Sequence, residues 1–161
     1  MSMSATDKPL RTQVFTPKDA AFEERVRASF ARQRVMSTIG AHLASVSPGE
    51  VIIELPFRED LTQQDGYLHA AIVTAIADSA CGYAAHTLIP AGAGILTVEY
   101  KVNFIAPPAG RAFTAYGRVT KPGRTLTVTT GEVIADTDTG PKSVAMMLAT
   151  MMTMSGRESA A

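Results

Sequence analysis

The sequence of 161 residues has little of what marks several common classes of protein. It contains no tryptophan and a single cysteine, Cys81. One cysteine cannot form an intrachain disulfide, and the paired CxxC motifs of zinc sites are absent. The three histidines, His42, His69 and His86, are scattered and include no i,i+4 pair that would seed a zinc site. We therefore expect no metal site.

An excess of charge and a long apolar run are also missing. Fifteen basic residues balance fifteen acidic ones, whereas a nucleic-acid-binding protein usually carries a basic excess. The most apolar stretch, 68–96, is interrupted by Asp78, His86 and Pro90 and is a poor membrane span. Residues 1–12 are polar and lack the apolar segment of a signal peptide. These features predict a soluble, cytoplasmic protein whose partner is a small molecule or another copy of itself.

What is present indicates a single folded domain. Hydrophobic residues make up 46% of the chain and charged residues 19%, and this length suffices for a sizeable core. No repeat or linker divides the sequence. We divide it into an N-terminal arm and helix (1–34), a main domain (35–155) and a tail (156–161).

Two helices are predicted. The first begins near Pro17 and ends near Gly40, because Phe22, Val26 and Phe30 recur at fourfold spacing. The second covers 69–86 and is apolar on almost all sides, which is typical of a helix buried in a core.

Six strands are predicted from β-branched and apolar runs between turn signals. The last four are joined by connections of about four residues, which indicates an antiparallel meander. We therefore expect an α+β domain in which an antiparallel sheet of five or six strands wraps around one buried helix. The predicted strands are 42–46, 50–57, 95–105, 111–120, 125–135 and 143–154.

Methionines crowd both faces of the last strand, where one face of a monomer's sheet would meet water. They mark either an adaptable core strand or a subunit interface. Oligomerisation is expected on either interpretation. The residues are Met146, Met147, Met151, Met152 and Met154.

Between His69 and His86, Asp78 is the only residue that carries a charge at neutral pH. It either faces solvent or a loop, or acts as a general base or nucleophile at the edge of an apolar pocket. His69 precedes the buried helix, whose first N–H groups could polarise a carbonyl oxygen, although a histidine there is more often a capping residue. Nine helical positions separate His69 from Asp78, about 13.5 Å and half a turn apart. If both serve one site, that site must be built from two chains.

Other candidates are weaker. Cys81 and His86 lie about 140° apart on a helix, so they do not form a nucleophile pair, and Cys81 is interpreted as core. The segment Lys121-Pro122-Gly123-Arg124 is usually no more than a hairpin turn. It could also offer two cations to the phosphates of a ligand.

Three segments carry a resemblance to a known family: GYLHAAIVTAIADSACGYAA, GILTVEYKVNFIAPPAG and GRVTKPGRTLTVTTGEV. They resemble the hotdog-fold acyl-CoA thioesterases of the PaaI-like, phenylacetate-degradation group, over residues 35–154. The family pattern has His-Gly-Gly at the start of the central helix and an acidic residue eight positions after the first glycine. Asp78 falls on the acidic position, and residues 103–107 match the end of the following strand.

The resemblance implies hydrolysis of a thioester between an acyl group and coenzyme A, with no cofactor apart from the coenzyme A of the substrate. It implies that Asp78 acts as base or nucleophile and that the Ala70 N–H, next to His69, polarises the carbonyl. Gln63 and Thr97 would place the substrate or the attacking water. The site would lie between subunits of a homodimer or homotetramer. The implied substrate-binding residues are Gly66, Val98, Lys121, Gly123 and Arg124.

Two departures stand out. Ala70-Ala71 replaces the two glycines, and Gln63 replaces an asparagine. Alanine keeps the N–H donor but narrows the approach to the backbone. The alternatives to a thioesterase are a non-catalytic hotdog module that binds acyl-CoA and, less favoured, a dehydratase.

Overall fold

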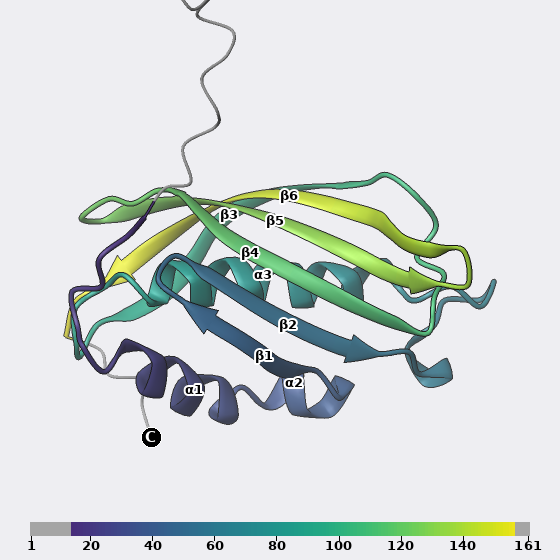
Figure 1. Cartoon of the computed structure of the whole chain (residues 1–161), viewed down its shortest axis with the longest axis horizontal. Coiled ribbons are helices and arrows are strands. Elements are labelled where there is room, and N and C mark those ends of the chain that lie inside the picture. Colours follow the sequence, from purple (N-terminus) through teal and green to yellow (C-terminus); the bar gives the residue numbers. More distant parts are fainter. Residues whose placement is uncertain (1–13, 157–161) are drawn as a thin grey trace, which may run out of the picture.

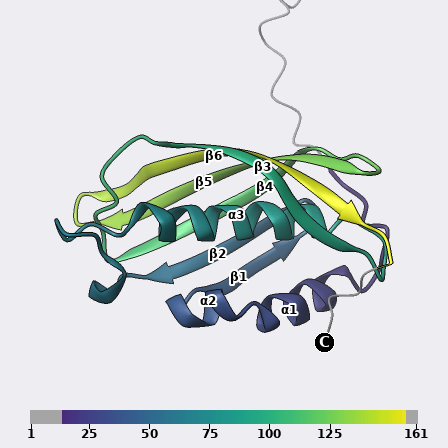
Figure 2. The ribbon, with the colours of Figure 1, turned by 180° about the vertical axis from the view of Figure 1, so that it is seen from behind.

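A computed structural model describes residues 14–156, in which a six-stranded sheet curls around one long helix and two further helices run along an edge of the sheet (Figure 1). Seen from behind, the long helix α3 lies across the concave face of the sheet (Figure 2). The α+β class and the central helix are confirmed. In chain order the elements are α1 (Phe22–Arg32), α2 (Arg34–Ile39), β1 (His42–Ser47), β2 (Glu50–Pro56), the 3-10 helix η2 (Glu59–Leu61), α3 (Ala70–His86), β3 (Gly94–Phe104), β4 (Ala112–Lys121), β5 (Leu126–Thr137) and β6 (Gly140–Met154).

The strand order is β1-β2-β4-β5-β6-β3, and all neighbours are antiparallel. The predicted meander is therefore right for β4-β5-β6 and wrong for β3, which pairs with β6 at the far edge. The connection 105–111 crosses three strand spacings, about 14 Å. Seven extended residues can span about 23 Å, so this connection can reach either the adjacent position or a distant one. A short connection therefore predicts that β4 runs antiparallel to β3, but not that the two strands are paired.

The N-terminal helix differs from its prediction at one end and in the middle. It begins at Phe22 rather than near Pro17, because the Asp19 carboxylate accepts the Ala21 N–H (3.0 Å) in a turn that precedes it. It is then interrupted at Gln33, whose backbone leaves helical geometry (φ −77°, ψ 88°) and separates α1 from α2. The predicted end is confirmed, since Gly40 takes a left-handed conformation with φ 79°.

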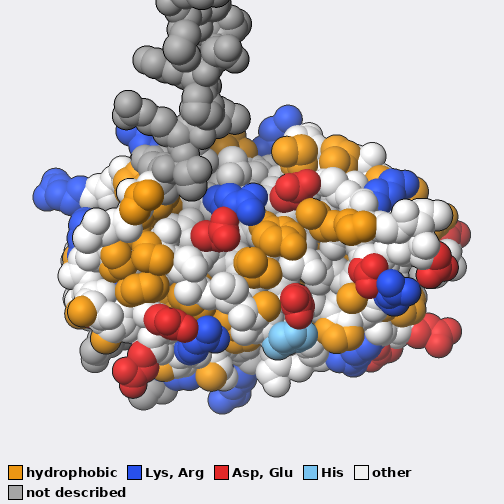
Figure 3. Space-filling view, in the orientation of Figure 1, with side chains coloured by type: hydrophobic (Ala, Val, Ile, Leu, Met, Phe, Trp, Pro, Cys, Tyr) orange, Lys and Arg blue, Asp and Glu red, His pale blue; other side chains and the backbone are white. Residues whose placement is uncertain are grey.

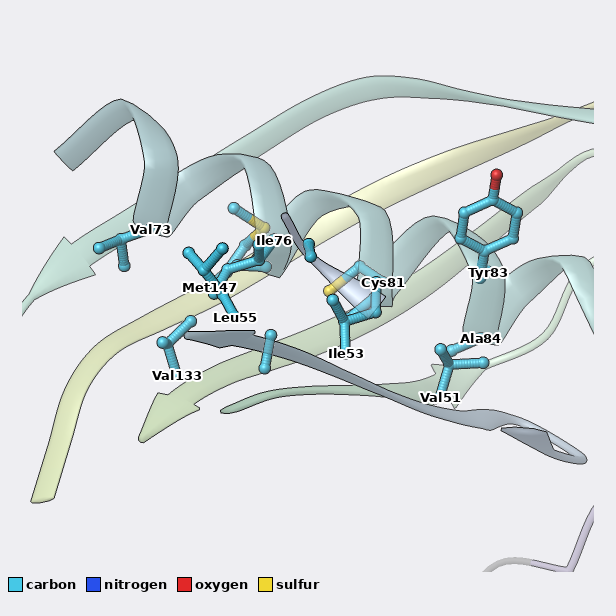
Figure 4. Packing of buried hydrophobic residues seen from close by; sticks show 14 of the residues in the cluster. Val51, Ile53, Leu55, Val73, Ile76, Cys81, Tyr83, Ala84, Val133 and Met147 are labelled. Atoms are coloured by element: carbon cyan, nitrogen blue, oxygen red, sulfur yellow. The ribbon is translucent and has the colours of Figure 1, made fainter. Parts of the chain in front are cut away.

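Helix α3 forms as the apolar sequence predicts, and its buried side chains meet β2, β5 and β6 (Figure 4). Val73 and Ile76 pack among Leu55, Val133 and Met147 in the core. None of the described helices is long and apolar enough to cross a membrane.

Helix α3 contacts the sheet most closely at two glycines, Gly117 of β4 and Gly131 of β5, which pair with each other. A Cβ atom on Gly117 would collide with the backbone of Ala80. A Cβ atom on Gly131 would lie 2.9 Å from the Cys81 Sγ atom. The helix has small residues on the side that faces these glycines, Ala80 and Cys81, and both are fully buried. The helix backbone therefore rests almost directly on the sheet.

Helix α1 is fastened to the end of α3 by Arg25. Its guanidinium pairs with Asp19 (2.9 Å) and donates to the His86 Nε2 atom (3.0 Å) and to the carbonyl oxygen of Ile89 (3.0 Å). Arginine can only donate, so His86 must accept at Nε2 and stay neutral. Burial, followed by the charge of Arg25, lowers the pKa of His86 to about 4.

We predict that Gly117→Ala lowers the free energy of unfolding by about 1–3 kcal/mol, because the methyl group forces α3 away from the sheet. Urea denaturation measures the change. Gly82→Ala, on α3 itself, is the matched control, since a Cβ atom there meets nothing within 4 Å. It should be neutral or stabilise the helix by up to about 1 kcal/mol. Equal stabilities of Gly117→Ala and the wild type would contradict the close contact.

We also predict that the protein loses stability as the pH falls from 6.5 to 4. In this range the unfolded chain binds a proton at His86 while the folded chain does not, so stability rises with pH and the total difference is at most about 3 kcal/mol. His86→Gln should remove this part of the pH dependence, measured as the free energy of unfolding from pH 4 to 7. His42→Gln, at an exposed histidine of β1, should leave it in place; an unchanged slope in His86→Gln would refute the assignment.

Candidate functional site

A cavity of about 940 Å³ lies between α1, the second half of α3 and the start of β3. The curl of the sheet brings β3 round toward α1 at this end of the molecule (Figure 2). Of the residues that line the cavity, all of them in the described part of the chain, Asp78 is the only carboxylate. The lining residues that matter below are Ser29, Arg32, Gln33, Asp78, Ser79, Tyr83, His86 and Thr97.

The structure brings two of the predicted site residues together, Asp78 and Thr97. The Thr97 hydroxyl donates to the Asp78 Oδ1 atom at 2.8 Å. Partial burial raises the pKa of Asp78, and the Thr97 hydrogen bond only partly opposes this effect. None of the ion pairs found in the described residues involves Asp78. A half-buried carboxylate with a single neutral partner is a competent base or nucleophile.

The start of α3 is the second cluster of predicted residues. His69 caps the helix, and its Nδ1 atom accepts the Ala71 N–H at 3.0 Å. The preceding turn is closed by the Gly66 N–H, which donates to the Gln63 carbonyl at 3.0 Å, and the Gln63 side chain accepts from the Asp65 N–H. Among the hydrogen bonds of the described residues, the exposed Ala70 N–H takes part in none. It is free to bind a carbonyl oxygen.

These two clusters do not meet within one chain. Helix α3 runs without interruption from Ala70 to His86, so the separation of about 13.5 Å between His69 and Asp78 holds in the folded protein. Within one chain, Gln63, Gly66, His69 and Ala70 therefore lie at one end of the helix, and Asp78 lies beyond its middle.

The remaining predicted residues lie at or near the cavity end of the sheet. Val98 is the extra residue of a bulge in β3, next to Thr97, and is half exposed. Lys121 is the exposed last residue of β4, and Gly123 and Arg124 lie in the exposed β4–β5 connection. Leu126, the first residue of β5, is opposite Met152 of β6, which is in turn opposite Leu96 of β3 at the cavity. Lys121, Gly123 and Arg124 do not line the cavity itself.

Cys81 is a core residue, as the sequence indicates. It is fully buried, and burial raises its pKa to about 12, so the thiolate that a nucleophile requires is not formed near neutral pH. Within residues 14–156, no three His, Cys, Asp or Glu side chains gather as metal ligands would.

Sequence reasoning missed the contribution of α1 to the site. Arg25, Ser29 and Arg32 line the cavity from this helix, and Gln33 does so from its end. Their spacing of four and then three residues is a polar helix face that the sequence could have revealed. Tyr83 completes this wall from α3, and its ring packs on Phe30 (5.6 Å between centroids).

Comparison with known proteins places the chain in a family. A model of the thioesterase superfamily matches residues 65–142, which include α3 and β3–β5. A solved thioesterase family protein from Silicibacter pomeroyi is 48% identical, covers 84% of this chain and 99% of its own, and has a TM-score of 0.83. A Saccharolobus solfataricus protein named only as a candidate esterase, SSO2140, is 30% identical over 59% of this chain and 67% of its own length.

The E. coli PaaI protein from the phenylacetic acid degradation operon shares the fold. Its structure covers 86% of this chain and 97% of its own with a TM-score of 0.76, at 18% identity. The long helix held against a curled antiparallel sheet is thus the hotdog arrangement that the resemblance implies. The chain belongs to the thioesterase superfamily and is a hotdog-fold hydrolase of that family.

Proposed function

We propose that this protein hydrolyses acyl-coenzyme A thioesters to a carboxylic acid and free coenzyme A in a site shared by two copies of the chain. The observation that carries the proposal is the position of Asp78. It is the one carboxylate lining the cavity in the described chain, and it has a raised pKa and a hydrogen bond from Thr97. Membership of the thioesterase superfamily supports a hydrolytic task for such a carboxylate.

Two routes fit this carboxylate. As a base, Asp78 takes a proton from water while the water oxygen adds to the thioester carbonyl, and the tetrahedral intermediate then expels the coenzyme A thiolate, which is protonated. As a nucleophile, its oxygen attacks the carbonyl, expels the same thiolate, and leaves an anhydride that water hydrolyses. In either case negative charge develops on the carbonyl oxygen and needs a donor.

The free Ala70 N–H at the start of α3 is the proposed donor. The partial positive charge of the helix N-terminus adds to its effect. His69 keeps the first turn in place by capping Ala71, so Ala70 points outward. Because α3 separates Ala70 from Asp78, the donor has to come from a second chain, together with the Gln63–Gly66 turn.

Exposed side chains on the edge strand β3 support the proposal that a second chain completes the site. Tyr100 and Phe104 are opposite Ala149 and Ala145, which are buried, so all four lie on the helix side of the sheet. Yet Tyr100 and Phe104 are 45% and 46% exposed, because their own α3 leaves these two side chains of the edge strand uncovered. A second copy that pairs along β3 would cover them and bring its own α3 alongside.

The outer face of the sheet carries a further apolar surface. Figure 3 shows this face, with hydrophobic side chains exposed between charged ones. Leu96, Leu126, Met146 and Leu148 are each about half exposed there, whereas Met147 and Met151 of the same last strand are buried. The methionine-rich strand is therefore core on one face and exposed on the other, which is consistent with a dimer of dimers.

Coenzyme A would approach from the end of the sheet where β3 begins. The exposed cations Lys121, at the end of β4, and Arg124, in the β4–β5 turn, lie near this end and can meet the phosphates. Gly123 has no room for a side chain there, since a Cβ atom would collide with the Leu126 carbonyl. Val98 and Gly66 of the two chains would border the reactive carbonyl.

We predict that Asp78→Asn lowers turnover of acyl-CoA by a factor of about 10² to 10⁴ with little effect on stability, since the amide keeps the shape and loses the basic oxygen. Release of coenzyme A thiol from a panel of acyl-CoAs measures the rate. Asp136→Asn is the control, because Asp136 pairs with Arg111 (2.7 Å) on β5 and does not line the cavity. If Asp78→Asn keeps more than about a tenth of the rate, the role of Asp78 is wrong.

The shared site predicts complementation between two inactive variants. Asp78→Asn disables the carboxylate side. Ala70→Pro removes the proposed N–H donor and should preserve the helix, because proline suits the first helical position and His69 is already extended (φ −62°, ψ 137°). Random exchange of equal amounts makes about half of the dimers mixed, with one intact site each, so about a quarter of the wild-type activity should return. Verified mixed dimers that stay inactive would exclude a site shared in this way.

The alternative function is a module that binds acyl-CoA without hydrolysis. The Ala70-Ala71 pair favours it, because the methyl groups narrow the approach to the helix N-terminus. Asp78 argues against it, since a half-buried carboxylate only weakens the binding of an acyl chain. Acyl-CoA that binds the wild type but releases no thiol would select the binding module.

A further inference from the structure

Gln33 occupies an unusual place at the wall of the cavity. It is the residue at which α1 breaks before α2, and its side chain is partly buried against α3. The Gln33 Nε2 atom donates to the Ser79 Oγ atom at 3.1 Å. Ser79 is itself buried and directly follows Asp78 on the helix. One end of the amide is thus fixed to the residue next to Asp78.

The other end of the amide is not used. The Gln33 Oε1 atom is buried and has no hydrogen-bond partner among the described residues. A buried carbonyl oxygen without a donor is costly, and such an atom in a cavity wall is expected to find its donor in a ligand.

The charges around the cavity restrict that donor. Arg25 and Arg32 both line it together with the one carboxylate, Asp78, so the net positive charge of the lining disfavours a protonated amine on the ligand. A hydroxyl group is a neutral donor that fits. It would also satisfy the amide in the reverse orientation, because a hydroxyl both donates and accepts.

We propose that Gln33 is a specificity-determining residue whose amide binds a hydroxyl group on the acyl part of the substrate. This inference rests on the proposed function, because it takes the cavity beside Asp78 as the acyl site. Because Ser79 adjoins Asp78 in the sequence, the substrate class that we test carries its hydroxyl close to the thioester carbonyl, as in a 3-hydroxyacyl group. The selectivity for such substrates comes from α1, through the break that turns Gln33 inward.

Binding tests the inference without requiring turnover. In the Asp78→Asn background, calorimetry compares 3-hydroxybutyryl-CoA with butyryl-CoA, which differ by the one hydroxyl. The hydroxylated ligand should bind between about fivefold and a hundredfold more tightly, because without it the buried oxygen stays unpaired. Gln33→Met, similar in length and without the amide, should abolish this ratio. Gln33→Glu, which keeps an acceptor oxygen, should retain part of it.

Each other outcome has a definite meaning. A ratio unchanged in Gln33→Met, or no preference in the parent protein, overturns the inference. If Gln33→Met in the otherwise wild-type enzyme lowers the turnover of both ligands equally and leaves the binding ratio intact, Gln33 holds the attacking water instead. Should Gln33→Met fail to fold, Ser79→Ala, which only releases the amide, must reduce the ratio.

Failure of the inference is distinguishable from failure of the proposed function. Hydroxyl-dependent binding without release of thiol refutes hydrolysis and leaves the role of Gln33 standing. Hydrolysis of both ligands at equal rates and equal affinity refutes the role of Gln33 and leaves the thioesterase standing.

Discussion

The contact of the α3 backbone with β4 and β5 is the constraint on which the rest of the structure depends. It exists because Gly117 and Gly131 present no side chains and Ala80 presents a small one. Once the helix is seated so closely, its rotation is fixed, since turning it would drive larger side chains into the sheet. The same rotation holds Asp78 toward β3, where Thr97 meets it at 2.8 Å. The geometry of the candidate site is thus a consequence of core packing.

The two edges of the sheet are treated differently, and this difference gives the site its character. At the β1 edge, α1 and α2 cover the sheet, and Arg25 ties α1 to the end of α3. At the β3 edge nothing in the described chain covers Tyr100 and Phe104. One edge thus closes the cavity within the chain, while the other is left uncovered, as the proposed pairing with a second copy requires. A helix whose carboxylate and free N–H groups are too far apart to cooperate alone fits such a pairing.

The positions of α3 and the strands could be predicted because their signals are local. An apolar run is enough to bury a helix, and β-branched segments between turn residues are enough to form strands. Asp78 could be singled out because a lone carboxylate in an apolar helix is costly unless it has a purpose. The break at Gln33 could not be predicted, because no proline or glycine marks it and the interruption depends on contacts with α3, 46 residues away in the sequence.

The sequence by itself determined the fold class, the buried helix, the candidate carboxylate and the need for two chains if both ends of that helix serve one site. Each follows from periodicity, composition or the fixed rise of a helix, which hold in any environment. Only the tertiary structure decided that β3 pairs with β6, that Thr97 is the partner of Asp78, and that α1 walls the cavity with Gln33 and Arg32. These three features depend on which surfaces meet, and that is decided by the packing of segments that are distant in the sequence.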